Sequence, residues 1–332
     1  MLRSTTLFMS ADVDTVPLVR TYRYARAVDR TCTLARAYLD DGRHRGRGEG
    51  SPFESFFVSD SSSTTRELLR AKDFVNAGGS VDTAIFRMND KPARNALEAA
   101  WLDFRAEREQ VTVAELLGIP APPALTVMTT VAMGDLDTVA ADLAQTRDHP
   151  LLKLKLGADD DADRLELVRA HRPDARLTVD VNGGWTAARF AELLPALLAA
   201  EVEMVEQPLA AAQEHLLPSI QSPIPVVADE SFSDGSDFER VRRYYDGMNV
   251  KLDKCGGLTA ALSCIEVAKD LGLRVMVGCL PASSLSTAVG MHAAQFAEWI
   301  DLDNHLWMDE DVQPAIGYRN GTLAPPTPEL WG

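Results

Sequence analysis

Five charged motifs recur between residues 153 and 254 at intervals of 22 to 26 residues, and each follows an apolar run typical of a buried strand. The motifs are Lys153-Leu-Lys155, Asp180-Val-Asn182, Glu206-Gln-Pro208, Asp229-Glu230 and Lys251-Leu-Asp-Lys254. One strand, one helix and two loops take about this many residues in an α/β barrel, where about 250 residues make eight units. The carboxyl ends of barrel strands surround one mouth, so the five motifs are expected to converge there.

Three of the motifs contribute a carboxylate. Asp180, Glu206 and Asp229 are hard oxygen donors, and no His or Cys accompanies them at these positions. Such a ligand set suits Mg²⁺ better than zinc. A single acid after a strand is more often a helix cap or a surface residue, but three in register favour a metal site.

Lys155 and Lys251 end the second and sixth predicted strands, which face each other across a barrel of eight. A buried lysine is costly to desolvate, so each needs either an acidic partner or a catalytic role. A lysine that acts as a base needs a pKa of about 7–8 instead of its usual ~10.4. Burial, a second ammonium group and a divalent cation all lower the pKa of a lysine.

The chemistry that suits two lysines around a magnesium ion is removal of a proton next to a carboxylate. We expect the metal and Lys153 to stabilise the resulting enediolate, with Lys153 orienting the substrate carboxylate. One lysine removes the proton and the opposite lysine returns it on the other face, which gives racemisation or epimerisation. Loss of a leaving group after the same first step would give β-elimination, and the five motifs do not separate these outcomes.

The elements that position these residues follow from apolar periodicity. Strands are predicted at 125–131, 151–156, 177–181, 202–205, 224–228, 248–252, 274–279 and 298–302. Helices are predicted between them at 136–146, 161–170, 186–199, 211–217, 237–244, 259–271 and 285–297. This alternation predicts a barrel domain over residues 123–305.

The first part of the chain lacks the alternation and predicts an α+β module over residues 1–122. It combines strands at 5–13 and 30–38 with helices at 63–76 and 92–109. Between the two strands lie residues 16–26, where the three-residue spacing of Arg20, Arg23 and Arg26 also suits one face of a short helix. The Gly- and Arg-rich stretch 40–52 predicts a hairpin turn leading into a loop. The Pro-rich tail, residues 306–332, is expected to pack back on this module.

Composition narrows the class of protein. The net charge of −16 argues against a nucleic-acid partner. The longest apolar stretch, 193–205, is too short and too interrupted by Pro and Glu to span a bilayer. The four cysteines form no CxxC pair and no signal peptide is apparent, so we expect reduced thiols and a cytoplasmic location.

The motifs resemble those of the enolase superfamily, and more narrowly its muconate-lactonizing-enzyme subgroup. Lys153 and Lys155 match the Lys-x-Lys motif of the family, Lys251 its second base, and the three acids its metal ligands. The stretch 46–52 looks like the second capping loop, and 93–118 like the helix and turn before the barrel. The resemblance implies a (β/α)₇β barrel with an α+β capping domain completed by the C-terminal tail, and Mg²⁺ as cofactor.

Two acids at the end of the eighth predicted strand resemble a feature of dipeptide epimerases. In those enzymes an Asp-x-Asp pair holds the α-ammonium of the substrate, and Asp301 and Asp303 match it. Two carboxylates beside lysines and a metal suit a cationic group, although a pair of acids facing solvent would explain the pattern without function.

Other positions narrow the substrate less sharply. The turn 278–284 is similar to the family's Gly-Cys-Met turn and contributes Ser283 as a substrate-binding residue. That turn has no acid, which disfavours muconate cycloisomerase activity. Arg20 and Arg23 lie in the presumed first capping loop and imply a site for an acidic second residue, as in L-Ala-D/L-Glu epimerases. A solvated, arginine-rich loop explains them equally well.

The sequence therefore predicts a Mg²⁺-dependent epimerase that acts at the α-carbon of the C-terminal residue of a dipeptide, with Lys155 and Lys251 as the opposed acid and base. One alternative is a cycloisomerase or an o-succinylbenzoate synthase-like dehydratase, whose substrates lack an α-ammonium. Another is an idle barrel that binds metal and carboxylate, against which the two opposed lysines argue. The preferred dipeptide stays open, and a homo-oligomer is compatible with the resemblance.

Overall fold

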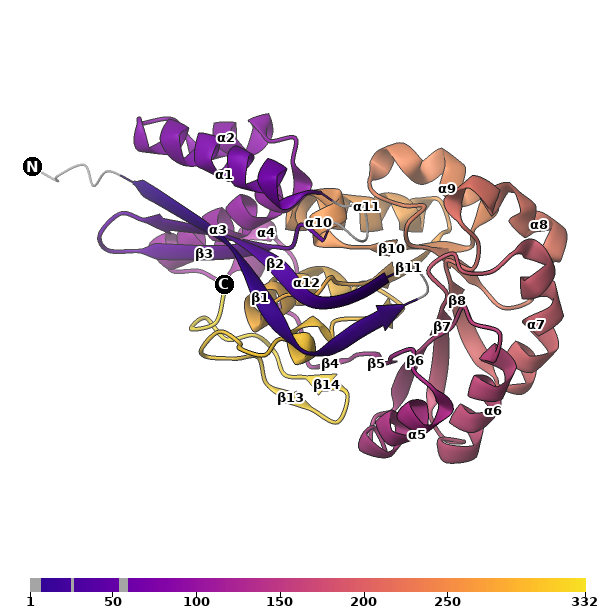
Figure 1. The fold of residues 1–332 in the computed structure, drawn as a ribbon. Coiled ribbons are helices and arrows are strands. Elements are labelled where there is room, and N and C mark those ends of the chain that lie inside the picture. Colours follow the sequence, from indigo (N-terminus) through magenta and orange to yellow (C-terminus); the bar gives the residue numbers. More distant parts are fainter. Residues whose placement is uncertain (1–6, 25–26, 54–58) are drawn as a thin grey trace, which may run out of the picture.

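The computed structural model describes residues 7–24, 27–53 and 59–332. An antiparallel sheet at the N-terminus precedes a parallel barrel that is ringed by helices (Figure 1). Within the described ranges, no helix combines the length and the apolar character needed to cross a membrane. The expected barrel with an α+β cap is confirmed.

The cap begins with three antiparallel strands, β1 (Phe8–Tyr24), β2 (Ala27–Asp40) and β3 (Arg45–Gly50). Its helices follow as α1 (Ser61–Asn76), α2 (Val81–Arg87), α3 (Lys91–Glu109) and α4 (Val113–Leu117). Helix α3 begins at an Asp90 side chain that accepts the Ala93 N–H, and Pro92 lies in its first turn, where no backbone donor is needed.

The arginine spacing does not correspond to a helix, because residues 16–24 form the second half of β1. Val16 pairs with Cys32 and Pro17 with Thr31, and the pairing resumes from Tyr22 to Tyr24 after an irregularity. Three-residue arginine spacing fits a helix, but pairing with β2 decides the conformation here. Long-range pairing of this kind overrides local pattern.

The predicted loop after residue 45 is also wrong. Strand β3 pairs with β2 along its whole length, and its alternate glycines lie against helix α3. A Cβ at Gly46 would meet the Ala100 carbonyl oxygen at 2.1 Å, and one at Gly48 would meet that of Ala96 at 2.1 Å. Every second residue is glycine because the strand and helix backbones approach too closely for a side chain, so these glycines are not turn signals.

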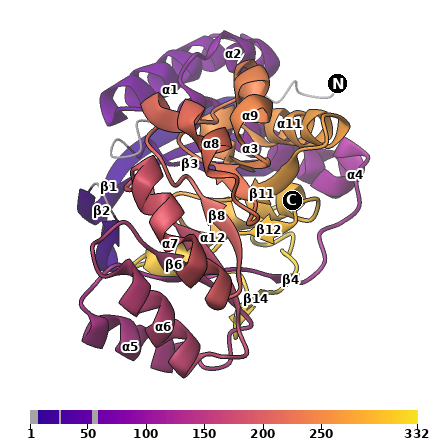
Figure 2. The same ribbon diagram turned by 90° about the vertical axis from the view of Figure 1, so that its right-hand side faces the viewer.

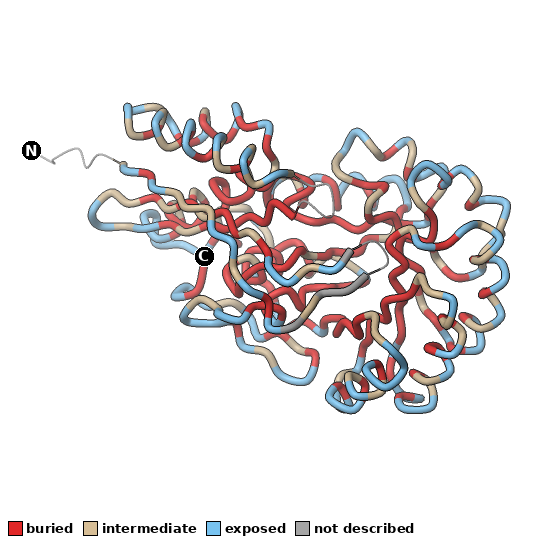
Figure 3. The backbone as a smooth tube through the Cα atoms, in the orientation of Figure 1, coloured by how far each residue is buried: buried red, intermediate tan, exposed pale blue. Residues whose placement is uncertain are grey.

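The barrel consists of eight parallel strands, hydrogen-bonded in sequence order. They are β5 (Thr129–Val131), β6 (Leu151–Lys155), β7 (Arg176–Asp180), β8 (Val202–Glu206), β9 (Val226–Ala228), β10 (Gly247–Val250), β11 (Arg274–Val277) and β12 (Trp299–Ile300). The ring closes where the Met128 N–H donates to the Ile300 carbonyl at 2.7 Å. Figure 3 shows most residues of these strands as buried.

Helices cover the outside of the barrel, as Figure 2 shows for α5 to α9. They are α5 (Leu136–Gln145), α6 (Asp161–His171), α7 (Ala187–Ala199), α8 (Leu217–Ile220), α9 (Phe238–Tyr244), α10 (Leu252–Cys255), α11 (Leu258–Asp270) and α12 (Ser284–Ala294). The predicted helix over 211–217 is a 3₁₀ segment, η2 (Ala211–Leu216), that runs into α8. The short α10 directly follows Lys251 and was not predicted.

The cap lies against the carboxyl ends of the barrel strands. An apolar cluster joins Leu18 and Phe53 of the cap to Leu280 of the barrel and Trp307 of the C-terminal segment, and Leu18 also forms an isolated bridge with Met308. Cap and barrel therefore share a packed interface at the mouth where polar residues are expected to converge.

The chain returns to the cap at its C-terminus. After the short strands β13 (Tyr318–Arg319) and β14 (Thr322–Leu323), which pair with each other while β14 also pairs with β4 (Leu125–Thr126), the last residues reach α3. The Trp331 indole N–H lies 3.2 Å from the Ala99 carbonyl, and the Gly332 N–H donates to Asp103 at 2.9 Å. The Arg47 guanidinium binds the Glu329 and Leu330 carbonyls, so this arginine joins the tail to the cap.

Candidate active site

Strand alternation separates the residues that line the barrel from those that face the helices. On β6, Leu152 and Leu154 belong to the core between strands and helices, so Leu151, Lys153 and Lys155 point inwards. A small apolar cluster closes the inside of the barrel below the mouth. Its members are Met128, Leu151, Met204, Val227, Met276 and Trp299. The next layer is charged: Lys153, Glu206, Asp229 and Asp301 each lie two positions beyond a member of this cluster.

Lys153 lies at the centre of this layer and is only 3% exposed. Its Nζ is 2.9 Å from Asp180 Oδ2, 2.7 Å from Glu206 Oε2 and 2.7 Å from Asp301 Oδ2. Four strand ends are thus joined through one ammonium group. The predicted convergence of the motifs at one mouth is observed.

Lys155 occupies one side of the layer. Its Nζ donates to Asp180 Oδ2 at 2.6 Å and to Asn182 Oδ1 at 3.0 Å. Asn182 has a positive φ of 47° and donates its side-chain amide to Glu230 Oε1 at 3.3 Å. Asn182 therefore bridges Lys155 to a carboxylate beside Asp229, a contact that sequence reasoning did not identify.

Lys251 occupies the opposite side and lies 2.9 Å from Asp229 Oδ2. Lys254 donates to the other oxygen of Asp229, Oδ1, at 2.7 Å and to the Asp229 carbonyl at 2.7 Å. Both oxygens of one predicted metal ligand are therefore held by ammonium groups. Lys254 contacts the site more directly than its sequence position indicated.

Two amide side chains orient the acids and were missed. Asn249 donates to Glu206 Oε1 at 2.7 Å, and Gln207 accepts the Asp229 N–H at 2.8 Å. Both are completely buried. The signal for Asn249 was present, because it lies two residues before Lys251 on the same strand and so faces the same interior.

Burial and charge shift the acids in different directions. Burial opposes the charge of Asp180, but the ammonium groups of Lys153 and Lys155 outweigh it and hold the pKa of Asp180 below its usual range. Burial and the neighbouring Asp180 raise the pKa of Glu206 to about 8. Burial lowers the pKa of Lys251, yet the carboxylates of Asp229 and Glu206 outweigh burial and raise it. The protein groups around Lys251 therefore raise its pKa, whereas a lysine that acts as a base is expected to have a lowered pKa.

The three predicted metal ligands fit an oxygen-seeking cation by their chemistry. Two of them, Asp180 and Glu206, already converge on the Lys153 ammonium, and Glu206 Oε2 is buried without an aligned hydrogen bond in the described chain. Across the described residues, no three His, Cys, Asp or Glu side chains are arranged around one point as metal ligands. When bound, Mg²⁺ supplies positive charge that offsets these acids and stabilises negative charge on a substrate carboxylate.

Asp301 and Asp303 line a small pocket of about 20 Å³. Asp301 Oδ1 is buried and has no hydrogen-bond partner within the described chain, whereas Asp303 Oδ2 accepts the Thr130 N–H at 2.9 Å. Burial and the neighbouring Asp301 raise the pKa of Asp303 to about 6. The two acids therefore differ in role. Asp301 Oδ1 is an acceptor without a partner in the described chain, and Asp303 links the end of the last barrel strand to the first strand, β5.

The remaining predicted substrate residues are placed less directly. The side chains of Arg20 and Arg23, and the whole of Arg26, lie outside the described residues. Ser283 is buried, donates its N–H to Glu49 and accepts the Leu285 N–H at the start of α12. Its binding role stays a prediction.

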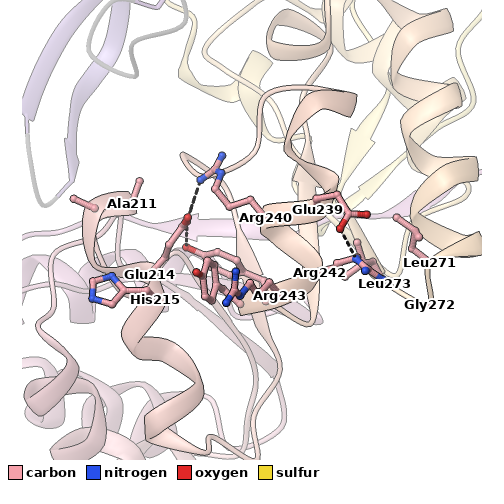
Figure 4. A pocket seen from close by; sticks show the side chains of 13 residues that line it. Ala211, Glu214, His215, Glu239, Arg240, Arg242, Arg243, Leu271, Gly272 and Leu273 are labelled. Atoms are coloured by element: carbon pink, nitrogen blue, oxygen red, sulfur yellow. Dashed lines mark hydrogen bonds and ion pairs between the residues drawn. The ribbon is translucent and has the colours of Figure 1, made fainter.

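A larger pocket of about 950 Å³ opens on the outside of the barrel, between η2, α9 and residues 271–273 (Figure 4). Arg240 there is paired with Glu214 at 3.0 Å and Arg242 with Glu239 at 3.1 Å. None of the predicted catalytic residues lines it.

The turn that carries Lys251 contains a buried acid, Asp253. Burial raises the pKa of Asp253 to about 7, although the Ser51 N–H and the Asn95 amide bonded to it act in the opposite direction. The folded protein therefore binds this proton more tightly than the unfolded chain. Its contribution to stability is complete below the unfolded pKa and is lost as the pH rises through about 7.

We expect Asp253→Asn to flatten the pH dependence of stability. The melting temperature of the unmodified protein should fall relative to that of the variant between about pH 4 and about pH 7, because the variant lacks the Asp253 carboxyl group that loses its proton there. Thermal unfolding of both proteins by circular dichroism across this range measures the difference. Parallel curves would show that Asp253 does not titrate in that window.

Known proteins resemble the chain over nearly its whole length. The model of the enolase C-terminal domain-like family matches residues 135–329. The L-Ala-D/L-Glu epimerase of Escherichia coli is 31% identical over 309 residues, which cover 92% of this chain and 96% of that protein.

Solved structures extend the similarity to the fold. An enolase family member from Agrobacterium tumefaciens with homology to dipeptide epimerases, solved with sodium and L-Ala-L-Glu, superposes with a TM-score of 0.93 at 33% identity and covers 98% of this chain and 100% of that one. A dipeptide epimerase from Cytophaga hutchinsonii, solved with Mg and D-Ala-L-Val, shares the fold at 22% identity with a TM-score of 0.87, covering 97% and 94% of the two chains. The resemblance inferred from the motifs is confirmed. The chain belongs to the enolase C-terminal domain-like family.

Proposed function

We propose that this chain is a Mg²⁺-dependent dipeptide epimerase that inverts the α-carbon of the C-terminal residue by a 1,1-proton transfer. The observation that carries the proposal is the placement of Lys155 at the end of β6 and of Lys251 directly after β10. These strands lie four apart in a ring of eight and so face each other across the barrel, with the acidic layer between them. A substrate between two such lysines exposes opposite faces of its α-carbon to them.

The roles of the side chains follow from their contacts. Lys153, already bound to three carboxylates, supplies the positive charge that orients the substrate carboxylate. One of Lys155 and Lys251, in its neutral form, takes the α-proton on its Nζ, and the other, as ammonium, gives a proton to the opposite face. Asp180, Glu206 and Asp229 would hold Mg²⁺.

Asp301 supports a dipeptide over related carboxylic acids. Its free Oδ1 is a buried acceptor close to the lysines, suited to an α-ammonium. Substrates of cycloisomerases and of o-succinylbenzoate synthase-like enzymes carry no such group. The Agrobacterium relative, which is 33% identical and was solved with a dipeptide, supports the same substrate class.

The domain organisation is part of the proposal. Residues 1–122 form the cap, 123–305 the catalytic barrel, and 306–332 a segment that completes the cap, which the bonds of Trp331 and Gly332 to α3 support. Arg20 and Arg23 remain proposed contacts for an acidic second residue. A cytoplasmic location and assembly into a homo-oligomer stay predictions.

The proposal is tested by incubating the protein with a dipeptide library and Mg²⁺ in D₂O. Replacement of one α-hydrogen by deuterium, with the opposite epimer appearing on chiral chromatography, is expected for a subset of dipeptides. Activity on muconate- or succinylbenzoate-type substrates with no dipeptide exchange would favour the alternative enzymes. Dipeptide binding without exchange would favour an idle barrel.

Asp301→Asn is expected to weaken dipeptide binding by about 10- to 100-fold, the effect of losing one charge-assisted hydrogen bond. The variant keeps an oxygen for Lys153, so Mg²⁺ affinity should stay within about twofold. Isothermal titration with each ligand separates the two effects. A matched N-acetyl amino acid, which has no α-ammonium, serves as the control ligand and should bind both proteins alike. Equal loss of metal and dipeptide affinity would contradict the assigned role.

A further inference from the structure

The turn that carries Lys251 is attached to the cap. Asp253 lies two residues beyond Lys251, within the single-turn helix α10, and is 4% exposed. Its Oδ1 accepts the Ser51 N–H at 3.0 Å and the Asn95 side-chain amide at 2.8 Å. Ser51 directly follows β3 and Asn95 belongs to α3, so both donors come from the cap.

The same part of the cap also holds the neighbouring turn of the barrel mouth. The Ser51 hydroxyl donates to the Pro281 carbonyl at 3.0 Å, and Glu49 Oε1 accepts the Ser283 N–H at 2.8 Å. Glu49 is itself held by Arg36 of β2 at 3.1 Å. The end of β3 is thus bonded to the turns after two successive strands, β10 and β11.

Close packing leaves little room for Asp253 to move. A Cβ at Gly50 would lie 3.2 Å from Asp253 Oδ1 and 2.2 Å from the Pro92 carbonyl oxygen. Glycine is required at this position so that β3 can approach both α3 and the Lys251 turn. Asp253 is therefore surrounded by backbone of the cap, and its hydrogen bonds are shielded from water.

The turn after Lys155 is held differently. The Gly157 and Ala158 N–H groups donate to Asp161 at the start of α6, at 3.0 to 3.1 Å. Asp161 also accepts the Trp185 indole N–H at 2.7 Å. These partners all belong to the barrel. The two opposed lysines thus stand on turns with different anchors. The cap holds the turn after Lys251 through Asp253, and Asp229 of the barrel also holds it through Lys254, whereas barrel residues hold the turn after Lys155.

We propose that Asp253 is a positioning residue for Lys251, and that the cap, acting through Asp253, fixes the reach of one base only. This inference rests on the proposed epimerase function. Asp253 touches neither substrate nor reacting atoms. It is the second residue of α10, and Lys251 is the residue that directly precedes this helix. Releasing the anchor displaces Lys251 and leaves Lys155 in place.

The two faces of the substrate should then respond unequally. Exchange of an α-proton with solvent, without inversion, needs only the lysine on that face. A displacement of about 1 Å in a reacting group can cost a hundredfold in rate. Loss of the Asp253 anchor should therefore slow exchange of one epimer far more than that of the other.

The experiment follows deuterium incorporation from D₂O separately for each pure epimer of an active dipeptide, with both epimers resolved by chiral chromatography and mass spectrometry. Lys155→Ala and Lys251→Ala first identify which epimer each lysine serves. Asp253→Ala, which removes the acceptor, should slow exchange of the Lys251-dependent epimer at least about tenfold and change the other by less than about twofold.

Asp253→Asn is the matched control, because its amide oxygen can still accept both cap hydrogen bonds. It should restore exchange of the Lys251-dependent epimer close to that of the unmodified protein. Asn95→Ala removes one of the two donors and should give a smaller loss on the same epimer, and it replaces Asp253→Ala as the test if the latter does not fold.

The outcomes separate the inference from the function. Equal loss of exchange for both epimers in Asp253→Ala or Asn95→Ala would overturn the positioning role, because general destabilisation affects both faces. Unchanged exchange in both variants would also overturn it. Absence of exchange by the unmodified protein with every dipeptide would instead overturn the proposed function.

Discussion

Replacing Lys155 or Lys251 with alanine is expected to lower the rate of epimerisation by at least about 10³-fold, the range that general acid–base catalysis supplies. The reason is the opposed placement of the two Nζ groups: inversion needs a proton removed on one face and returned on the other. The remaining lysine cannot replace the missing one, because it reaches only one face of the substrate α-carbon. Each single variant should still exchange the α-proton of one epimer with solvent.

Polarimetry of an active dipeptide measures the inversion rate, and thermal unfolding checks that each variant folds. Lys269→Ala is the matched control, because Lys269 is exposed on α11 in the outer layer of helices, where its ammonium lies over the Phe296 ring. It should leave the rate unchanged. Inversion by Lys155→Ala or Lys251→Ala at more than about a tenth of the original rate would show that the lysine is not a catalytic base.

Glu206→Gln is expected to weaken Mg²⁺ binding at least about a hundredfold, beyond the loss usual for residues that only support metal ligands. The variant keeps the shape of the side chain and the oxygen that accepts the Asn249 amide, but removes the charge that a divalent cation requires. Glu206 is fully buried, so an anion from the solvent cannot take the place of its carboxylate. Loss of epimerase activity should accompany the loss of metal.

Isothermal titration calorimetry measures the affinity of the protein for Mg²⁺ independently of catalysis. Glu203→Gln provides a control on the same strand, since Glu203 is paired with Arg176 at 2.7 Å on the exposed side of β8. Its Mg²⁺ affinity should match that of the unmodified protein. A Glu206→Gln protein that binds Mg²⁺ normally would remove Glu206 from the ligand set and with it the proposed metal site.

Much of the barrel could be derived from the sequence because the patterns that specify its strands lie within short stretches of the chain. Each strand is a short apolar run, each motif ends such a run, and alternate residues face opposite sides. Lys153 and Lys155 therefore had to share one side of β6. Equal spacing then brought motifs from successive strands to one mouth, whatever the details of the helices between them.

The cap could not be derived in the same way, because its conformation depends on distant partners. Residues 16–24 carry a helix-like spacing but extend β1, since β2 offers hydrogen bonds to them. The glycines of β3 have the composition of a loop, yet they allow the strand to lie against α3. Neither partner is visible in the local pattern.

At the site, the sequence by itself determined which charged groups meet, because strand spacing and side-chain alternation are local properties. Only the tertiary structure decided how those groups pair. In the structure, Lys153 contacts three carboxylates, and the two oxygens of Asp229 pair with Lys251 and Lys254. Asp301 pairs with Lys153, whereas Asp303 accepts the Thr130 N–H. The tertiary structure also tied Asp253 to the cap. Pairing of this kind depends on side-chain reach across strands and between domains, which neither spacing nor composition encodes.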